Sequence, residues 1–280
     1  MKKINVSKIS SIVSELCIKA NFRQRRDVQR ALKAALKKET KNAAKSVLRI
    51  LLENANIARL ERRALCQDTG IVSVYVEIGQ DVRLVGGSLQ RAINDGVKHA
   101  YKEEFLRKSV VKSPLFRTNT HTNIPAVIHT EIVRGNKFKV SVMPKGFGSE
   151  NKSKIKMLNP TAGEAEIVSF VCDVVRSAGP DGCPPYILGI GIGGTFDKSA
   201  ILAKKALLLS VNKSNPIKYL RKLEQNILRE VNTLEIGPMG LGGKTTCLGV
   251  NILEYPTHIA GLPVAVNVGC HVTRSASRVV

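Results

Sequence analysis

Tryptophan is absent from this chain, and aromatic residues together make up only 4% of it. Long apolar runs are also missing, because none approaches the roughly 20 residues that a bilayer-spanning helix requires. The first residues, "MKKINVSKISSIVSEL", place polar side chains inside the apolar stretch that a signal peptide needs. These absences predict a cytoplasmic protein with no membrane partner.

Cysteine is scarce as well. Six cysteines in 280 residues are too few for a disulfide scaffold, and the reducing cytosol would keep them as thiols. No C-x-x-C pair occurs, which argues against a zinc ribbon or a thioredoxin-like dithiol. We therefore expect thiols that are buried, catalytic or metal-bound, at positions Cys17, Cys66, Cys172, Cys183, Cys247 and Cys270.

Acidic residues are in deficit: 44 Lys and Arg stand against 22 Asp and Glu, a net charge of +22. Residues 1–63 alone hold 17 basic and 5 acidic residues. Such a field suits nucleic acid, an anionic substrate or an acidic partner subunit, although a solvated basic helix surface would need no partner. Few aromatic residues and no recognition module make nucleic acid the distant alternative, and we expect no nucleic-acid partner.

The periodicity of apolar residues changes along the chain. Residues 10–63 lack Gly and Pro and carry Ala43, Val47, Ile50 and Leu51 at helical spacing. "IVSVYVEIG" then alternates like a half-buried strand, and "AVIHTEIV" and "KFKVSVM" read as a hairpin joined by "RGNK". We expect a basic helical segment over residues 1–63 and a catalytic region over 64–280, both in one continuous structural unit.

Further elements follow irregularly. A capping box of Thr161 and Glu164 predicts a helix that ends at Gly179. The strand "YILGIGI" precedes a second helix, and Asn215-Pro216 predicts the start of a third. Irregular alternation that includes a hairpin predicts an α+β fold, with mixed helices and short strands, rather than a doubly wound sheet.

Two glycine-rich stretches look like phosphate-binding loops. "GIGIGG" has no acidic residue about 20 positions further on to bind a ribose, so its glycines are expected to allow close packing. "GPMGLGGKTT" ends like a P-loop, but Pro238 stands at the first glycine position and a strand-like run follows where a helix is needed. Neither stretch predicts a nucleotide site.

Three cysteines lie in expected loops rather than in regular elements. Cys66 opens "CQDTG", Cys183 lies in "GPDGCPP", and Cys270 lies in "VNVGCHVTRS". A cysteine followed by proline occurs in iron–sulfur ligation. Three thiolates would leave one iron of a four-iron cluster without a protein ligand, able to act as a Lewis acid on a substrate oxygen. A cluster that carries electrons or supports the fold is the other interpretation.

Five motifs together resemble a known family. "CQDTG", "KGFGSENKS", "CPPYILGIGIGGT", "GLGGKTT" and "HIAGLPVAVNVGC" occur in this order, and from about residue 10 onward the chain resembles the class I fumarases and L-tartrate dehydratases. It is similar to the alpha subunit of their two-chain form. The resemblance implies a separate beta subunit with the remaining catalytic residues, a heterotetramer of two alpha and two beta chains, and an oxygen-sensitive iron–sulfur hydro-lyase.

The resemblance also implies roles for single residues. Cys66, Cys183 and Cys270 would ligate a [4Fe-4S] cluster with one open iron. Asp68 and His258 would be catalytic, and the substrate would be bound by Gln67, Arg107 and Gly148. Other interpretations stay open for three of them: Asp68 as the cap of a turn, Arg107 as a surface arginine, and His258 as a packed loop residue.

The chemistry matches these residue types. Water adds across the double bond of fumarate to form L-malate, and the reverse reaction expels hydroxide from malate, so a Lewis acid and a positioned base are needed. An arginine can hold a substrate carboxylate through two hydrogen bonds. We therefore expect reversible hydration of fumarate, with dehydration of L(+)-tartrate to oxaloacetate as the alternative, and a chain that is inactive without its partner.

Overall fold

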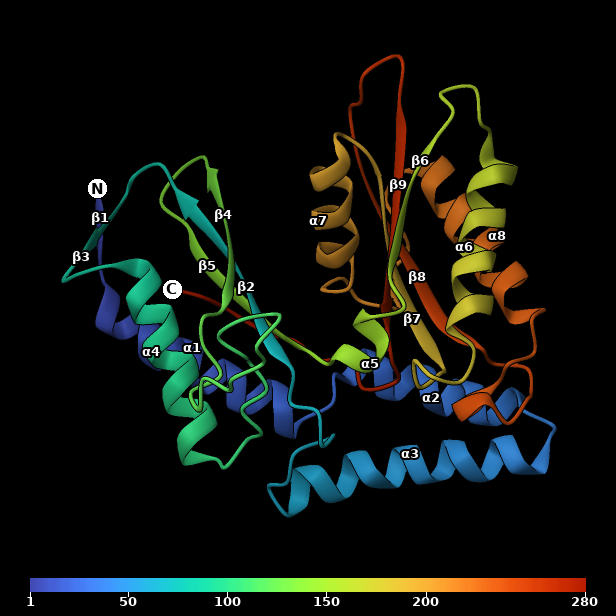
Figure 1. Ribbon diagram of the computed structural model, residues 1–280, viewed down its shortest axis with the longest axis horizontal. Coiled ribbons are helices and arrows are strands. Elements are labelled where there is room, and N and C mark those ends of the chain that lie inside the picture. The colour runs from blue at the N-terminus through green and yellow to red at the C-terminus, as the bar shows by residue number, and fades with distance from the viewer. The chain divides into compact units, whose positions relative to one another are not determined.

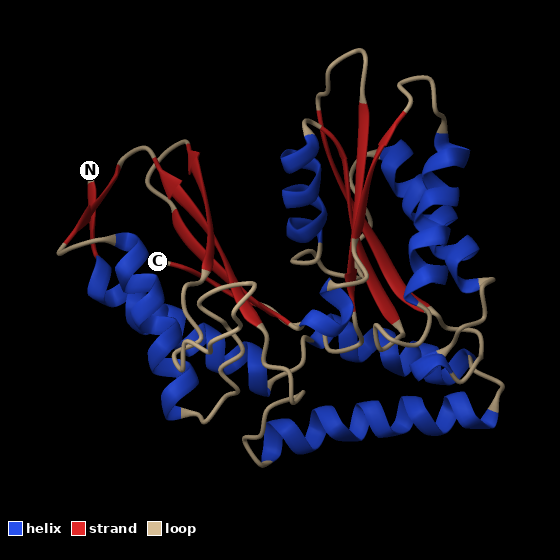
Figure 2. Cartoon of the chain, viewed as in Figure 1, coloured by secondary structure: helices blue, strands red, loops and turns tan.

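A computed structural model describes residues 1–280, and the chain divides into two compact units. Unit 1 consists of Met1–Arg25, Ile57–Phe147 and Arg274–Val280, and unit 2 of Arg26–Asn56 and Gly148–Thr273. Each unit combines helices with a mixed four-stranded sheet, which confirms the α+β prediction (Figures 1 and 2). None of the helices has the length and apolar character needed to cross a membrane.

The N-terminal residues are helical as predicted, with two breaks. The helices are α1 (Val6–Phe22), α2 (Arg26–Lys38) and α3 (Asn42–Leu60). Helix α1 belongs to unit 1, α2 belongs to unit 2, and α3 begins in unit 2 and ends in unit 1. The expected division into residues 1–63 and 64–280 rests on composition and stays a prediction.

The sheet of unit 1 has the order β10-β5-β2-β4. Its central strand β2 pairs parallel with β4 and antiparallel with β5, while β1 and β3 form a separate parallel pair. Apolar side chains of helices α1 and α4 share one buried core with this sheet. The elements are β1 (Lys2–Asn5), β2 (Ile71–Gly79), β3 (Val82–Val85), α4 (Leu89–Glu103), β4 (Val127–Val133), β5 (Phe138–Lys145) and β10 (Ala276–Val279).

The predicted hairpin between β4 and β5 is wrong. Both strands exist, but β2 lies between them and pairs with each. The connecting residues pass over the end of β2, where Gly79 N donates to Lys137 O at 2.7 Å and Gln80 N donates to Val133 O at 2.9 Å. The Gly-Asn pair correctly signals a chain reversal, yet turn chemistry does not say which strand fills the space between the two arms.

The sheet of unit 2 has the order β6-β9-β7-β8. Helix α7 lies on one face, and α6 and α8 cover the other (Figure 1). Apolar residues of α6, α8 and three strands form the core of this unit. The elements are α5 (Phe147–Glu150), β6 (Lys154–Leu158), α6 (Glu164–Ala178), β7 (Tyr186–Gly193), α7 (Phe196–Ala206), α8 (Lys218–Asn232), η1 (Pro238–Gly240), β8 (Cys247–Tyr255) and β9 (Leu262–Gly269).

The two sheets share one arrangement. In each, a central strand has a parallel neighbour on one edge and an antiparallel neighbour on the other. The antiparallel register places the start of β2 against the end of β5 (Ile71 opposite Lys145), and the start of β7 against the end of β9 (Ile187 opposite Gly269). Segments just before each central strand therefore meet segments just after its antiparallel partner.

Two helix starts differ from the prediction. Helix α6 is capped by Gly163, whose N–H donates to Glu166 Oε2 at 2.9 Å, while Thr161 bonds to the side chain of Asn159 instead. Helix α8 begins at Lys218, because the buried side chain of Asn215 bonds to Glu224 and to Ile252 O. Local signatures of a helix start lose to such competing hydrogen bonds. The predicted end of α6 at Gly179 is confirmed.

The glycines of "GIGIGG" serve close packing, as predicted. A Cβ at Gly189 would lie 2.1 Å from Ala203 O, and a Cβ at Gly191 would lie 2.0 Å from Ser199 O. Both oxygens belong to helix α7, so the backbone of this helix lies directly on β7. The strand expected after "GGKTT" is also confirmed, as β8.

Glu39 joins the turn between α2 and α3 to the loop that contains "GLGGKTT". Its side chain is buried, with Oε1 accepting from Thr40 N (2.8 Å) and Lys41 N (3.0 Å) and Oε2 accepting from Lys244 N (2.8 Å). Burial alone raises the pKa of this carboxyl, but the three N–H donors and the charge of Lys244 outweigh it, and the pKa is lowered. Glu39 is therefore a charged anchor within unit 2.

We expect Gly191→Ala to lower the free energy of unfolding by about 1–3 kcal/mol, because the new methyl group overlaps the α7 backbone and forces the helix off β7. Gly261→Ala is the matched control in unit 2, since nothing lies within 4 Å of its Cβ position. Urea unfolding measures both. Equal stability of the two variants would contradict direct packing of α7 on β7.

We expect Glu39→Gln to lose about 1–3 kcal/mol of stability at neutral pH, because the amide NH₂ cannot accept from Lys244 N. A lowered folded pKa contributes stability above the unfolded value near 4.3, and this contribution disappears as pH falls through the folded pKa. The gap to wild type should thus close below about pH 4. Denaturant unfolding at a series of pH values measures the stability difference between wild type and variant. Glu53→Gln, at an exposed position, is the control. A difference that does not change with pH would refute the conclusion that Glu39 is ionised in the folded chain.

Candidate functional site

The "CQDTG" segment lies in unit 1, in the loop that leads from α3 into β2. Leu65 N donates to Asn21 O at 2.9 Å at its start, and Thr69 Oγ1 donates to Arg107 O at 2.8 Å near its end. Gly70 has a φ of +74°, and a Cβ there would lie 2.5 Å from the backbone of Lys145. The motif therefore must end in glycine, because the chain turns tightly onto β5 at this point.

The backbone carbonyls of this segment are held by three buried side chains. Tyr101 donates its hydroxyl to Thr69 O at 2.5 Å, and burial raises the pKa of this phenol, so it stays a donor. The other two contacts are from Asn123 Nδ2 to Gly70 O at 3.1 Å and from the Arg274 guanidinium to Asp68 O. With its carbonyls fixed in this way, the segment presents its side chains from a rigid backbone.

Asp68 is half-buried, and both of its oxygens are engaged. Oδ1 accepts from Gly70 N at 3.0 Å, and Oδ2 accepts from Phe147 N at 2.8 Å. The first contact is the turn-capping role considered for Asp68, and the second ties the motif to "KGFGSENKS". A carboxylate has about four acceptor positions, so two remain for a further partner. Asp68 is thus an oriented carboxylate with acceptor positions left for a further partner.

Gln67 and Arg107 flank Asp68 in unit 1, and both side chains are exposed. The Arg107 backbone contacts the motif through Thr69, so the structure brings this arginine beside "CQDTG". Gly146 also approaches, because a Cβ there would lie 3.0 Å from Asp68 Oδ2. The backbone positions of Gln67, Asp68 and Arg107 therefore lie in one region of this unit.

Cys183 and Cys270 come together in unit 2 through the sheet register. Cys183 lies shortly before β7, Cys270 directly follows β9, and these two strand ends are paired. His271 completes the contact: its backbone N donates to Cys183 O at 3.3 Å, and its Nδ1 donates to the same oxygen at 3.0 Å. Burial lowers the pKa of the His271 imidazole, and its hydrogen bond to Cys183 O offsets part of this decrease.

The Cys183 loop is held in a strained form. Cys183 has a φ of +59°, in the left-handed region that ordinary residues rarely adopt. Its N–H donates to Pro180 O at 3.0 Å, and Met239 N donates to Pro184 O at 2.8 Å. The strand that follows is tied down as well, since Tyr186 N donates to Thr246 O at 2.8 Å. The segment that contains "GPMGLGGKTT" therefore supports the cysteine loop.

Gly148 lies beside the same loop of unit 2. A Cβ at Gly148 would be 3.9 Å from Asp181 O, and Lys152 forms an ion pair with Asp181 at 2.8 Å. "KGFGSENKS" thus reaches the segment that carries Cys183. The backbone amide of Gly148 is placed at a predicted ligand loop.

His258 is not brought to these cysteines within unit 2. It is exposed in the loop between β8 and β9, where its Nδ1 accepts from Ala260 N at 3.2 Å. That loop passes the far end of β7, opposite the end where Cys183 precedes it. Eight residues of extended strand span about 25 Å. His258 therefore stands apart from Cys183 and Cys270.

The six thiols are free and fall into two groups. Cys17 and Cys247 are buried. Burial raises the pKa of the Cys247 thiol to about 12 and raises the pKa of the Cys17 thiol still further. Burial also raises the pKa of Cys172, which lies on helix α6. The other group, Cys66, Cys183 and Cys270, is half-buried in loops. Soft thiolates in accessible loops suit iron–sulfur ligation, so the donor chemistry fits. Neither unit by itself gathers three His, Cys, Asp or Glu side chains that could hold a metal ion.

Sequence reasoning missed the side chains that hold these loops. Tyr101 lies among the apolar positions of helix α4, a pattern that signals burial but not its hydrogen bond to Thr69 O. Asn123 and Arg274 had no local signal, although Arg274 follows Cys270 by only four residues. Arg274 is 4% exposed, and its buried Nε has no hydrogen-bond partner. A buried arginine of this kind is recognised only when its surroundings are known.

Comparison with known proteins agrees with the motifs. The family model described as fumarate hydratase (fumerase) matches residues 10–279. A protein of Methanocaldococcus jannaschii named putative L(+)-tartrate dehydratase subunit alpha is 40% identical over 275 residues, covering 96% of each chain. The L(+)-tartrate dehydratase subunit alpha of Escherichia coli K12 is 28% identical over 284 residues, covering 100% of this chain and 93% of the relative. That of Escherichia coli UTI89 is 29% identical over 274 residues, covering 96% and 89%. With a match over nearly its whole length, this chain belongs to the fumarate hydratase (fumerase) family of hydro-lyases.

Proposed function

We propose that this chain is the alpha subunit of a class I, iron–sulfur hydro-lyase that reversibly hydrates fumarate to L-malate with a separate beta subunit. The observation that carries the proposal is the family match over residues 10–279. The relatives named as alpha subunits support a two-chain enzyme. The six free thiols suit a reducing compartment, and we place the enzyme in the cytoplasm.

We propose that Cys66, Cys183 and Cys270 hold a [4Fe-4S] cluster. They are the three half-buried thiols in loops, while two of the other three are enclosed in the cores of their units. The pairing of β7 with β9 and the bonds from His271 hold two of them in one place. When bound, the cluster supplies one open iron that polarises the carbon–oxygen bond of the substrate as a Lewis acid.

The substrate is a dianion, and we propose that three groups of this chain bind it. The exposed guanidinium of Arg107 can take one carboxylate through two parallel hydrogen bonds. Gln67 donates from its amide without adding charge, and the N–H of Gly148 serves as a further donor. The net charge of +22 raises the local concentration of a dicarboxylate.

We propose that Asp68 handles the proton of the reaction. Two N–H donors fix its oxygens, and the carbonyl beside it is held by Arg274, so the carboxylate keeps one orientation while a proton moves. His258 is exposed at the other end of β7, and we propose that it serves the site of a neighbouring protomer in a heterotetramer of two alpha and two beta chains. The remaining acid and base belong to the beta subunit.

Dehydration of L(+)-tartrate to oxaloacetate is the second candidate. The specific observation in its favour is that all three relatives described above are named L(+)-tartrate dehydratase subunits. L-malate, the hydrated form of fumarate, and L(+)-tartrate differ by one hydroxyl, and a site that hydrogen-bonds a hydroxyl can reject the analogue lacking it by a factor of about 10⁴. Kinetic preference therefore separates the candidates cleanly.

We expect serine substitutions at Cys66, Cys183 or Cys270 to abolish retention of a [4Fe-4S] cluster after anaerobic reconstitution, because a lost thiolate leaves a second iron without a ligand. Iron and sulfide content and electron paramagnetic resonance measure it. Cys172→Ser is the matched control, since Cys172 is also a half-buried thiol but lies on helix α6. Full cluster content in any of the first three variants would remove that residue from the ligand set.

We expect the reconstituted chain to show no turnover alone and to hydrate fumarate once its beta subunit is added. Fumarate, malate and L(+)-tartrate are assayed anaerobically by absorbance, and kcat/KM is compared. In the complex, Asp68→Asn should lower kcat by about 10² or more with little change in KM, because a proton carrier is lost while binding groups stay. Robust turnover by the chain alone would overturn the two-subunit proposal, and a preference for tartrate would select the second candidate.

A further inference from the structure

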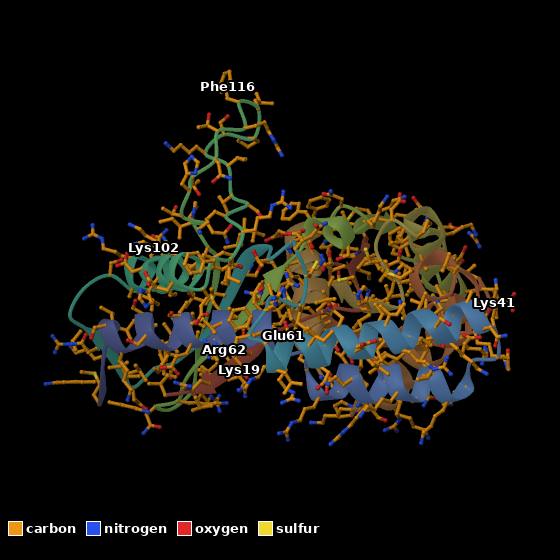
Figure 3. The ribbon with its side chains drawn as sticks, turned by 90° about the horizontal axis from the view of Figure 1, so that it is seen from below. Lys19, Lys41, Glu61, Arg62, Lys102 and Phe116 are labelled. Carbon is orange, nitrogen blue, oxygen red and sulfur yellow. The ribbon has the colours of Figure 1, made fainter.

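A finger-like loop, residues 105–123, extends from unit 1 between α4 and β4. Figure 3 shows Phe116 at its tip, far from Lys102 at the end of α4. Leu115 is 86% exposed and Phe116 is 85% exposed, and Phe105 at the base is 91% exposed. Large apolar side chains that are adjacent in the chain and this exposed to solvent indicate an interaction site rather than ordinary surface.

The finger is built by its own hydrogen bonds. Val111 and Asn119 form an antiparallel bridge, which closes the two arms on each other. Two hydrogen bonds cross between the arms: Lys112 N donates to Thr118 O at 2.7 Å, and Thr120 N donates to Val110 O at 2.9 Å. At the turn, Arg117 N donates to Ser113 O at 3.0 Å. The tip is therefore preorganised, and less conformational entropy is lost when it binds a partner.

The charge of the finger indicates what kind of surface it would bind. Between residues 105 and 123 the chain carries four basic side chains and no acidic one: Arg107, Lys108, Lys112 and Arg117. A second copy of this chain also carries a charge of +22, so two such surfaces repel each other. The complementary surface is an apolar pocket with an acidic border on a different chain.

The base of the finger is fastened to the candidate site. Asn123 is fully buried, accepting from Ser109 N at 2.7 Å and donating to Gly70 O at 3.1 Å. Arg107, at the other side of the base, accepts from Thr69 Oγ1 at 2.8 Å. Both arms thus end on "CQDTG". A partner chain that completes the active site would be positioned relative to "CQDTG" by binding this element. Binding to a membrane or a nucleic acid would make no use of that link.

We infer that residues 105–123 form the docking finger for the beta subunit, with Leu115 and Phe116 inserted into an apolar pocket that acidic side chains border. This inference rests on the proposed function, since it takes the beta subunit of that enzyme as the occupant. Insertion of the tip aligns the "CQDTG" backbone with the residues that the beta subunit contributes.

The test uses the full chain and the beta-subunit homologue from the same source, mixed under anaerobic conditions. Leu115→Ser with Phe116→Ser should weaken their association by at least about tenfold, because two central apolar anchors are removed. Ile132→Ser is the matched control: Ile132 is also in unit 1 and 75% exposed, on β4, and its substitution should leave affinity unchanged. Circular dichroism and thermal unfolding verify that all variants fold, as expected for exposed positions.

A charge variant tests the acidic border separately. Lys112→Glu with Arg117→Glu should slow association and reduce its dependence on salt, because electrostatic steering is lost. Wild-type chain is also tested with phosphatidylserine vesicles. Loss of vesicle binding in the tip variant, with unchanged affinity for the beta subunit, would overturn the inference in favour of a lipid surface.

The outcomes separate this inference from the proposed function. If the tip variant binds the beta subunit as tightly as wild type and the complex is active, the docking finger is refuted and the hydro-lyase stands. If the wild-type complex forms through the finger but converts none of the three substrates, the docking finger stands and the hydro-lyase is refuted. Selective loss of association in the tip and charge variants, with Ile132→Ser unchanged, supports the inference.

Discussion

The antiparallel register of each central strand is the constraint on which the candidate site depends. Hydrogen bonding fixes Ile71 opposite Lys145 in unit 1 and Ile187 opposite Gly269 in unit 2. A slip of one residue would turn every side chain of the strand to the other face and move the flanking loops. Because the candidate residues lie just outside these strand ends, the same bonds that build the sheets also place those residues.

A second level of order holds the loops themselves. In unit 1, buried Tyr101 and Asn123 satisfy carbonyls of "CQDTG", and the Arg274 guanidinium contacts Asp68 O. In unit 2, His271 and Met239 do the same for the Cys183 loop. Buried carbonyls without partners are costly, so each contact is a structural need as well as a constraint on geometry. Sites that must bind and react within a few tenths of an ångström require such support.

One of these supports, Asn123, also lies at the base of the proposed docking finger. The docking finger carries basic residues and an open apolar tip, yet its base is among the well-bonded parts of unit 1. In the proposed two-subunit enzyme, the alpha chain needs a surface for the chain that completes its site. Because the same buried asparagine holds Gly70 and the base of the finger, the proposed docking would be joined to the geometry of the motif.

Much of this protein could be predicted from the sequence alone. Apolar periodicity identified the helices of residues 10–63, strand β2 and helix α6, because those patterns depend only on which face is buried. The close packing expected of the glycines in "GIGIGG" is confirmed, and the five motifs identified the family that the comparisons show. Loop cysteines were separated from packing cysteines by their neighbours, which agrees with the burial of Cys17 and Cys247.

Tertiary structure decided what depends on residues distant in the chain. It inserted β2 between β4 and β5, moved the start of α8 because Asn215 bonds to Glu224, and chose Tyr101, Asn123 and Arg274 as supports. It also set His258 at the far end of β7 from Cys183. Local sequence reports the period of burial and the chemistry of turns. The pairing of strands and the satisfaction of buried polar groups are settled only when the whole chain has packed.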